Sequence, residues 1–208
     1  FCGIKLTGVT GDIAANYNAI SITVDNRWNT LYEVYWINNT GTGNRESYLG
    51  NTFSSGNGFY NAGISHLISL NNGTLQRIVS DNSTIGLIFN NQYKKIVGYY
   101  STGSAPTGSE TVTNNNFSNI ESTDVCGMYI NSDRAGNRIY SGNTISNIIS
   151  GSEQSLVGIY CITPTNITCT ISNNTISNLT GRAFTIAIKV ENTNSVISGN
   201  IIDNVKGG

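Results

Sequence analysis

A repeat of about 28 residues constrains this chain more than any other feature of its sequence. Four windows align with one another without gaps, and each reads as a short strand, a corner containing Asn or Gly, and a second short strand. Equivalent asparagines in successive windows are 28, 31 and 26 residues apart. The windows are residues 111–120, 139–148, 170–179 and 196–205, with a weaker copy at 48–55.

A second recurring strand lies between these windows, at residues 127–130, 158–161 and 185–188, and residues 86–89 are interpreted as an earlier relative. One coil made of such short strands cannot bury its own apolar side chains, so the coils must stack on copies of themselves. The repeat therefore predicts an all-β solenoid of about seven coils, each about 4.8 Å from the next.

Alternation along the strands predicts which side chains face the interior. Tyr140 stands where the other copies carry an aliphatic residue, and this departure indicates a bulge. The remaining residues expected to point inward are Val112, Ile171 and Ile197 before the corner and Phe117, Ile145, Ile176 and Ile202 after it.

Asparagines recur at two positions of the repeat, and buried amides need hydrogen-bond partners. Identical Asn side chains one coil apart can supply those partners as a ladder. Alternation places the second set on the same inward side as the isoleucines. The predicted ladder residues are Asn115, Asn143, Asn174 and Asn200 at the corner, and Asn119, Asn147, Asn178 and Asn204 further along.

The composition supports a packed β protein. Asn, Ser, Thr and Gly supply 100 of the 208 residues, yet 27 residues are Ile, too many for a disordered chain. Charged residues make up 11% and the net charge is −1, so no basic surface for nucleic acid is expected. No apolar run approaches the roughly 18 residues of a membrane span, so no membrane insertion is expected.

The windows at 139–147, 171–178 and 197–204 resemble the right-handed parallel β-helix repeat of the pectin-lyase-like superfamily and of bacterial surface β-helix proteins. The resemblance implies a single β-helix domain over 1–208, with strong repeats at 110–205 and irregular coils at 1–109. It implies an extracellular or bacterial cell-surface location, and it raises the alternative of a polysaccharide lyase or glycoside hydrolase. Calcium is expected only under that alternative, and no other cofactor or metal is expected.

The enzyme alternative needs a site, and one charged cluster stands out from the sparse background. It comprises Glu121, Asp124, Asp133, Arg134 and Arg138. Carboxylates could hold a metal ion or protonate a glycosidic oxygen, and an Arg could act beside them. The competing interpretation is a solvated loop cluster, and the Asn-Thr-Asp, Asp-Asp, Gly-His-Gly and Arg-Ile-Lys signatures of polygalacturonases are absent.

Two tyrosines offer a different kind of site. If Met128 and Ile159 point inward, Tyr129 and Tyr160 point outward one coil apart and could contact sugar rings. Ala187 is expected at the next position, where such a platform would end. Coverage by a loop, or simple cross-strand stacking, would explain the same pattern.

The remaining reactive residues give no catalytic arrangement. His66 is the only histidine and is expected to be packed beside Ile64. The four cysteines match no zinc spacing. Cys126 is expected to be a buried thiol, whereas a disulfide between Cys161 and Cys169 is geometrically conceivable and stays open.

A third candidate function is an ice-binding surface, which would need a regular outward row of threonines. Thr144 and Thr175 are the only neighbours that align, because Asn116 and Ile201 interrupt the row at either end. This interpretation is therefore disfavoured.

The sequence thus favours a secreted or cell-surface β-helix module with a structural or adhesive role that contacts a polysaccharide or cell-surface glycan. The repeat continues almost to Gly208, and the segment from Phe1 to Leu6 lacks the polar character of a cap. Open terminal coils expose apolar core and unpaired backbone. We therefore expect the chain to be part of a longer solenoid, or to stack on other copies as a filament.

Overall fold

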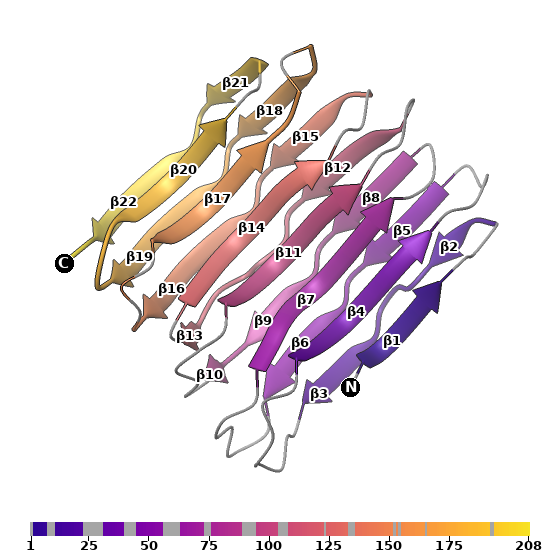
Figure 1. Cartoon of the computed structure of the whole chain (residues 1–208), viewed down its shortest axis with the longest axis horizontal. Helices are drawn as coiled ribbons and strands as arrows, with labels where there is room; N and C mark the ends of the chain where they lie inside the picture. Colours follow the sequence, from indigo (N-terminus) through magenta and orange to yellow (C-terminus); the bar gives the residue numbers. More distant parts are fainter. Residues whose placement is uncertain are drawn as a thin grey trace.

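The computed structural model of this chain consists, in the part it describes, of β-strands and the loops that join them (Figure 1). It describes residues 2–7, 11–22, 31–39, 45–55, 63–72, 76–88, 95–103, 108–122, 124–132, 136–151, 153, 155–164, 166–191 and 194–208. No helix occurs within these ranges.

The strands form four parallel sheets, named sheets 1 to 4 below. Sheet 1 contains, in spatial order, β1 (Cys2–Thr7), β4 (Leu31–Asn39), β7 (Gly63–Asn72), β11 (Lys95–Gly103), β14 (Asp124–Ser132), β17 (Leu156–Ile162) and β20 (Thr185–Glu191). Sheet 2 contains β2 (Ile13–Ala14), β5 (Arg45–Leu49), β8 (Gln76–Ser80), β12 (Ser109–Thr113), β15 (Arg138–Ser141), β18 (Thr168–Ser172) and β21 (Asn194–Ser198). Sheet 3 contains β10 (Leu87–Ile88), β13 (Ile120–Ser122), β16 (Thr144–Ser150), β19 (Thr175–Gly181) and β22 (Ile201–Lys206). Sheet 4 contains β3 (Ala19–Ile22), β6 (Thr52–Ser55) and β9 (Ser83–Ile85).

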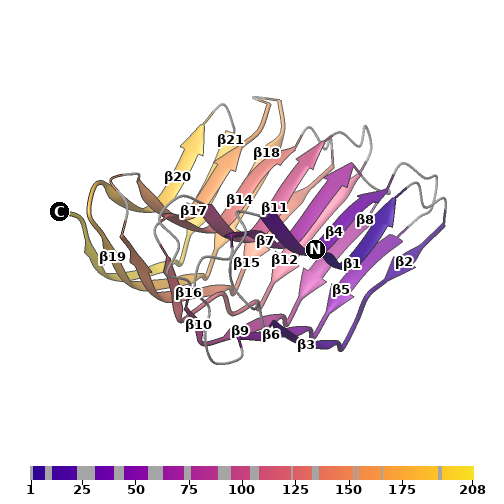
Figure 2. The same cartoon turned by 60° about the horizontal axis from the view of Figure 1, so that its bottom comes forward.

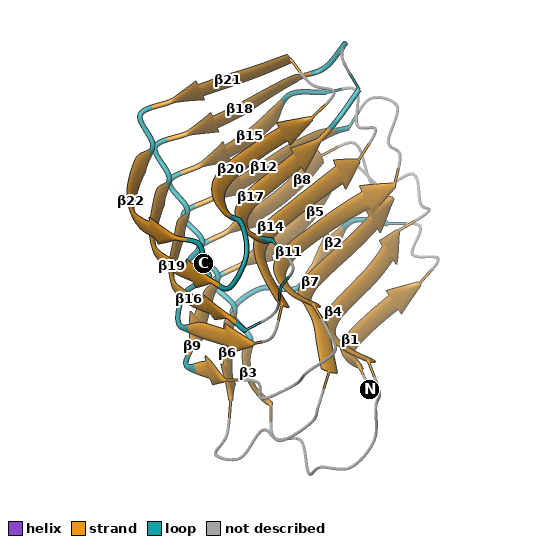
Figure 3. Cartoon of the chain, turned by 60° about the vertical axis from the view of Figure 1, so that its left-hand side comes forward, coloured by secondary structure: helices purple, strands orange, loops and turns teal. Residues whose placement is uncertain are grey.

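The chain passes through the sheets in a fixed order, so that each strand pairs with its equivalent in the next coil. One coil runs from β12 in sheet 2 through β13 in sheet 3 to β14 in sheet 1. Figure 1 shows the coils following one another from the N-terminal end of the stack to the C-terminal end. Figures 2 and 3 show sheets 3 and 4 along a third side of the stack, beside sheets 1 and 2. The prediction of an all-β parallel solenoid is confirmed.

One strand assignment made from the sequence is wrong. Residues 86–89 were expected to be the earlier relative of 127–130, but Leu87–Ile88 is β10 and pairs with β13 in sheet 3. The true equivalent of β14 in the preceding coil is β11. The corner asparagines from Asn51 to Asn115 are 31 and 33 residues apart, compared with 28, 31 and 26 residues from Asn115 to Asn200, so the period is longer in the earlier coils.

An apolar core runs along the inside of the stack. Phe117, Ile145 and Ile176 are fully buried in it, as the alternation predicts. Ile202 has the same place in the last coil but is 52% exposed, because no described coil covers it. Ile197 is half-exposed for the same reason.

Tyr140 does not mark a bulge. It pairs in register between Val112 and Ile171, and all three side chains are buried. The ring fits inside because Cys161 and Cys169, which are small, lie close to it in the same core. The strand therefore keeps its alternation, and only the size of the inward side chain changes.

A column of glycines sets the closest approach between sheet 1 and the core. Gly98, Gly127 and Gly158 occupy equivalent places in β11, β14 and β17. A Cβ atom on Gly127 would lie 2.6 Å from the carbonyl oxygen of Gly158 and 2.8 Å from Cγ2 of Ile145. These distances are far below van der Waals contact, so the backbone here has room only for a hydrogen.

The corner asparagines form a buried ladder, as predicted. Asn143 shows its geometry: Nδ2 donates to the carbonyl of Val112 at 2.9 Å and to Oδ1 of Asn174 at 3.0 Å. Its own Oδ1 accepts from the backbone N and the Nδ2 of Asn115, at 3.0 and 2.9 Å. The ladder is longer than the sequence indicated, because Asn51 and Asn82 continue it into earlier coils.

The second set of asparagines also forms a ladder, but the prediction that it faces inward is wrong. Nδ2 of Asn147 donates to Oδ1 of Asn119 at 3.0 Å, and both residues are exposed. Asn178 and Asn204 continue the row outside the core. Each of these residues has a φ near +55°, which turns the chain and breaks the alternation on which the prediction depended.

Candidate functional site

Arg138, one of the predicted catalytic candidates, is buried. Its side chain is 1% exposed and lies inside the solenoid, whereas Glu121 is exposed. Asp133 and Arg134 lie outside the described residues, and so does the side chain of Asp124, whose backbone begins β14. Arg138 is therefore excluded as a residue that meets a substrate on the surface.

Arg138 belongs instead to a buried charge column, defined as Glu46, Arg77, Glu110 and Arg138. The column follows the inward face of sheet 2 across four neighbouring strands, where each residue pairs in register with the next. All four side chains are at most 1% exposed. The charge alternates in sign from coil to coil, which is the arrangement that buried ions require.

Hydrogen bonds within the core hold the centre of this column. Nε of Arg77 donates to Oε2 of Glu46 at 2.7 Å, and Nη1 donates to Oγ of Ser101 at 3.0 Å. Ser101 in turn donates to Oε2 of Glu110 at 3.2 Å, and the hydroxyl of Tyr99 donates to the other Glu110 oxygen. The network joins three coils through side chains of sheets 1 and 2.

The protonation states in this network follow from its charges. Burial opposes the charge on Arg77, but Glu46 and, to a smaller extent, Tyr99, Glu110 and Tyr48 together outweigh that cost and raise the pKa of the guanidinium. Burial, reinforced by the neighbouring Glu110, raises the pKa of Tyr99 well above its usual value. Tyr99 therefore remains a hydrogen-bond donor to the Glu110 carboxylate, and the column is a structural element sealed from solvent.

A column of tyrosines lies on the outward face of sheet 1. Tyr100, Tyr129 and Tyr160 pair in register on β11, β14 and β17, and all three are partly exposed. The rings of Tyr100 and Tyr129 are stacked, with centroids 5.2 Å apart and planes 12° apart. The Tyr160 ring is turned by 87° relative to that of Tyr129, with centroids 5.4 Å apart. The column thus presents ring edges and hydroxyl groups in its first two coils and a differently oriented ring in the third.

The tyrosine column ends in a charged pair. Lys189 is in register with Tyr160, and its Nζ lies 4.4 Å from the centroid of that ring. Nζ is also 2.8 Å from Oε1 of Glu191, whose Oε2 accepts a hydrogen bond from the Tyr160 hydroxyl at 2.7 Å. The hydrogen bond from Lys189, with that from Tyr160, lowers the pKa of Glu191. The hydrogen bond to Glu191 raises the pKa of Lys189. The pair therefore carries a full positive and a full negative charge at neutral pH.

Only Tyr129 and Tyr160 of this column were predicted from the sequence. Tyr100 was missed because residues 86–89, and not 98–101, were aligned with the repeat. Ala187 was expected next to Tyr160, but the register neighbour is Lys189. A better signal was available: a Gly followed by an outward Tyr two residues later occurs in three successive coils.

A small apolar cluster lies under the tyrosine column, separate from the main core. Val97, Cys126 and Val157 are its buried members, and Ile186 and the three tyrosines pack against it. In β14, both Cys126 and Tyr129 belong to this outer cluster, whereas Val125 and Met128 lie in the main core. The cluster fixes the base of each tyrosine and leaves its outer edge accessible.

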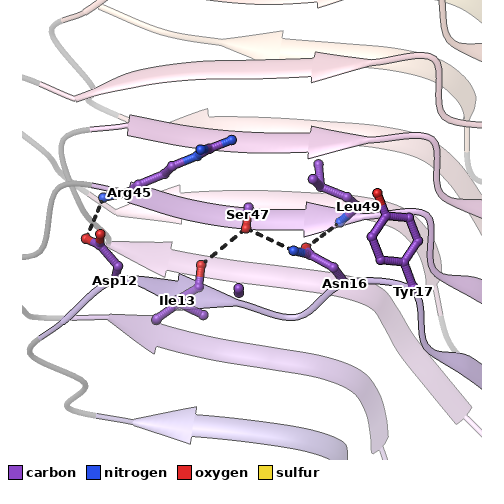
Figure 4. A pocket seen from close by; sticks show the side chains of 8 residues that line it. Asp12, Ile13, Asn16, Tyr17, Arg45, Ser47 and Leu49 are labelled. Atoms are coloured by element: carbon purple, nitrogen blue, oxygen red, sulfur yellow. Dashed lines mark hydrogen bonds between the residues drawn. The ribbon is translucent and has the colours of Figure 1, made fainter.

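A shallow hollow of about 430 Å³ lies over β2 and β5 (Figure 4). Its polar groups bond to one another: Oδ1 of Asp12 accepts from the backbone N of Arg45 at 3.0 Å, and Oδ1 of Asn16 accepts from that of Leu49 at 2.9 Å. The figure shows the Arg45 side chain and the Tyr17 ring at opposite ends of the hollow. Among its described lining residues there is one carboxylate, that of Asp12.

The side chain of His66 lies outside the described part, and its backbone pairs with Val97. The threonine row is interrupted as expected, because Thr144 and Thr175 lie in register between Asn116 and Ile201. Among the described side chains there is no group of three or more His, Cys, Asp or Glu that could hold a metal ion.

Within the described ranges, no helix has the length and hydropathy to cross a bilayer.

The fold defines the class of this protein as a parallel β-solenoid. Comparison of the chain with known protein families, curated proteins and solved structures finds no match.

Proposed function

We propose that this protein is an extracellular or cell-surface β-solenoid module with a structural or adhesive role, and that it contacts polysaccharide through the tyrosine column. The observation that carries the proposal is the row Tyr100, Tyr129 and Tyr160 on the outer face of sheet 1, followed by Lys189 and Glu191. Aromatic side chains with a polar end suit ligands that have both apolar and hydroxyl-bearing surfaces.

The spacing of the column supports an extended ligand that runs along the solenoid axis. Successive ring centroids are 5.2 and 5.4 Å apart, a step comparable to the length of one sugar ring in an extended chain. The hydroxyls of Tyr100 and Tyr129 would bond sugar hydroxyls, and the turned Tyr160 ring would contact the apolar edge of a sugar. Lys189 and Glu191 would receive the polar groups at the end of the segment.

The rigidity of the face also favours binding without catalysis. The tyrosines are fixed at their base by the outer apolar cluster, and their backbone is held in a seven-stranded sheet. A surface that is organised before binding loses little conformational entropy when the ligand arrives. A structural or adhesive module gains from such a surface, because many copies can act together on one polymer.

Affinity electrophoresis through gels that contain neutral or acidic polysaccharides tests this proposal. At least one polysaccharide should retard the wild-type protein, and Tyr129→Ala should weaken that binding about tenfold, the loss of one stacking or hydrogen-bonding anchor. Tyr17→Ala is the matched control, because Tyr17 is 79% exposed but lies away from the column. Tyr129→Phe separates the contribution of the hydroxyl from that of the ring.

Equal retardation of the wild-type protein and Tyr129→Ala would show that the column is not the binding surface. If no polysaccharide in the panel retards the protein, the proposal is wrong for that panel's chemistry. Release of shortened or unsaturated sugars from the same polysaccharides, with calcium present, would instead favour the lyase or hydrolase alternative.

A further inference from the structure

Two cysteine sulfurs meet inside the core at the turn between sheet 1 and sheet 2. Cys161 lies in β17 and Cys169 in β18, which are consecutive strands of one coil. Their Sγ atoms are 3.2 Å apart, and neither residue is exposed. Cys126 makes a different contact, because its Sγ donates to the carbonyl of Met128 at 3.3 Å.

The surroundings leave little else for this pair to do. A zinc site would need further Cys, His or carboxylate ligands arranged around the metal, and no such group occurs among the described side chains. Catalysis by a thiolate would need access to solvent, which both residues lack. The pair lies in the main apolar core with Tyr140 and Ile130.

We propose that Cys161 and Cys169 form a disulfide that staples this coil. The two S–H bonds break, one S–S bond forms, and two protons and two electrons pass to an oxidant of the small-molecule disulfide class, which leaves as two thiols. The sulfurs need to approach by only about 1.2 Å to reach the covalent length of about 2.05 Å. Small rotations of both side chains are sufficient, because the two strands already hold the sulfurs facing each other.

The bond would form while the coil is still assembling. The attacking species in disulfide exchange is the thiolate. In the folded chain, the hydrogen bond with Cys169, together with burial, raises the pKa of the Cys161 thiol, so the thiolate is scarce. Neither sulfur can then meet an oxidant from solution. In the unfolded chain, both thiols are accessible and only eight residues apart, so exchange is rapid.

The test is oxidative refolding followed by peptide mapping. The denatured, reduced chain is refolded with a mixture of oxidised and reduced glutathione, then denatured again with an alkylating agent and digested. Because residues 162–168 contain no basic, acidic or aromatic residue, we expect Cys161 and Cys169 in one peptide that carries no alkyl group and an internal disulfide, with Cys2 and Cys126 alkylated. Alkylation of both Cys161 and Cys169, or bridges to other cysteines as the main product, would overturn the proposal.

Stability gives a second readout with a matched control. Closing this short loop should raise the melting temperature of the wild-type chain by about 5–10 °C over the reduced form. Cys126→Ala should keep that rise, whereas Cys169→Ala should abolish it. If Cys169→Ala fails to fold, the peptide map of the wild-type chain still decides the question.

Discussion

Nε of Arg77 donates a hydrogen bond to Oε2 of Glu46, 2.7 Å away in the neighbouring coil, at a depth where neither side chain reaches solvent. Removing one member leaves the other charge buried without its main partner. Glu46→Ala should therefore lower the free energy of unfolding by about 3–5 kcal/mol, measured by urea denaturation. The double variant Glu46→Leu with Arg77→Met should recover most of this loss, because it removes both charges and keeps the volume. A loss below about 1 kcal/mol for Glu46→Ala would contradict this account of the column.

The two asparagine ladders should differ in their contribution to stability. Asn143→Ala removes the partners of Asn115, Asn174 and the carbonyl of Val112 in a dry interior. Because each buried group left unsatisfied costs about 1–3 kcal/mol, we expect a loss of about 3 kcal/mol or more in urea denaturation. Asn147→Gly in the exposed ladder is the control. It also removes hydrogen bonds, but water replaces them and Gly tolerates the positive φ, so its effect should stay within about 1 kcal/mol. Equal losses of unfolding free energy in the two variants would contradict the idea that burial makes the inner ladder the more stabilising one.

The glycine column predicts that adding one methyl group to sheet 1 causes a steric clash and lowers stability. Gly127→Ala places a Cβ 2.6 Å from the carbonyl oxygen of Gly158, and backbone of the next coil cannot move aside cheaply. We expect a loss of about 3 kcal/mol, at the upper end of the cost of overpacking. Gly11→Ala should change stability by less than about 0.5 kcal/mol, because no atom lies within 4 Å of its Cβ. Thermal unfolding of both variants, monitored by circular dichroism, measures this difference in stability.

The Tyr160 phenol should titrate in a way that reports its two charged neighbours. Burial, followed by the hydrogen bond to Glu191, raises the pKa of Tyr160, whereas Lys189 acts in the opposite direction. Glu191→Gln removes the negative charge that opposes ionisation, so the pKa should fall relative to the wild-type chain. Lys189→Gln removes the positive charge that favours the phenolate, so the pKa should rise. NMR titration of ring-labelled tyrosine measures both, and shifts of the same sign would show that the charged pair does not contact the ring in solution.

The solenoid could be predicted from sequence because the repeat is a property of the chain alone. The buried ladder of Asn115 and Asn143 followed from it, since identical amides one coil apart satisfy each other. The orientation of Asn119 could not be predicted by alternation, because its positive φ turns the chain. That conformation is open to Asn in a way that simple periodicity does not include.

The burial of Arg138 shows that a charged residue in a charge-poor chain need not lie on the surface. Its neighbours in sequence made it look like part of a surface loop, but it lies two residues before the inward Tyr140. The same two-residue offset relates Glu110 to Val112, so alternation placed both charges inside. A buried charge is strongly destabilising unless an opposite charge lies beside it. In this protein the neighbouring coil supplies that opposite charge. The sequence of one coil alone therefore does not show that its charged residue can be buried.

The alternating signs of Glu46, Arg77, Glu110 and Arg138 restrict how this solenoid can change its length during evolution. In a repeat protein each unit contacts only its neighbours, so removal of a unit brings its two neighbours together. Here, deletion of the coil that carries Arg77 would bring Glu46 beside Glu110, and deletion of the coil that carries Glu110 would bring Arg77 beside Arg138. Loss of both of these coils restores a Glu beside an Arg. The stretch from Glu46 to Arg138 can therefore shorten or lengthen in pairs of coils without placing like charges side by side.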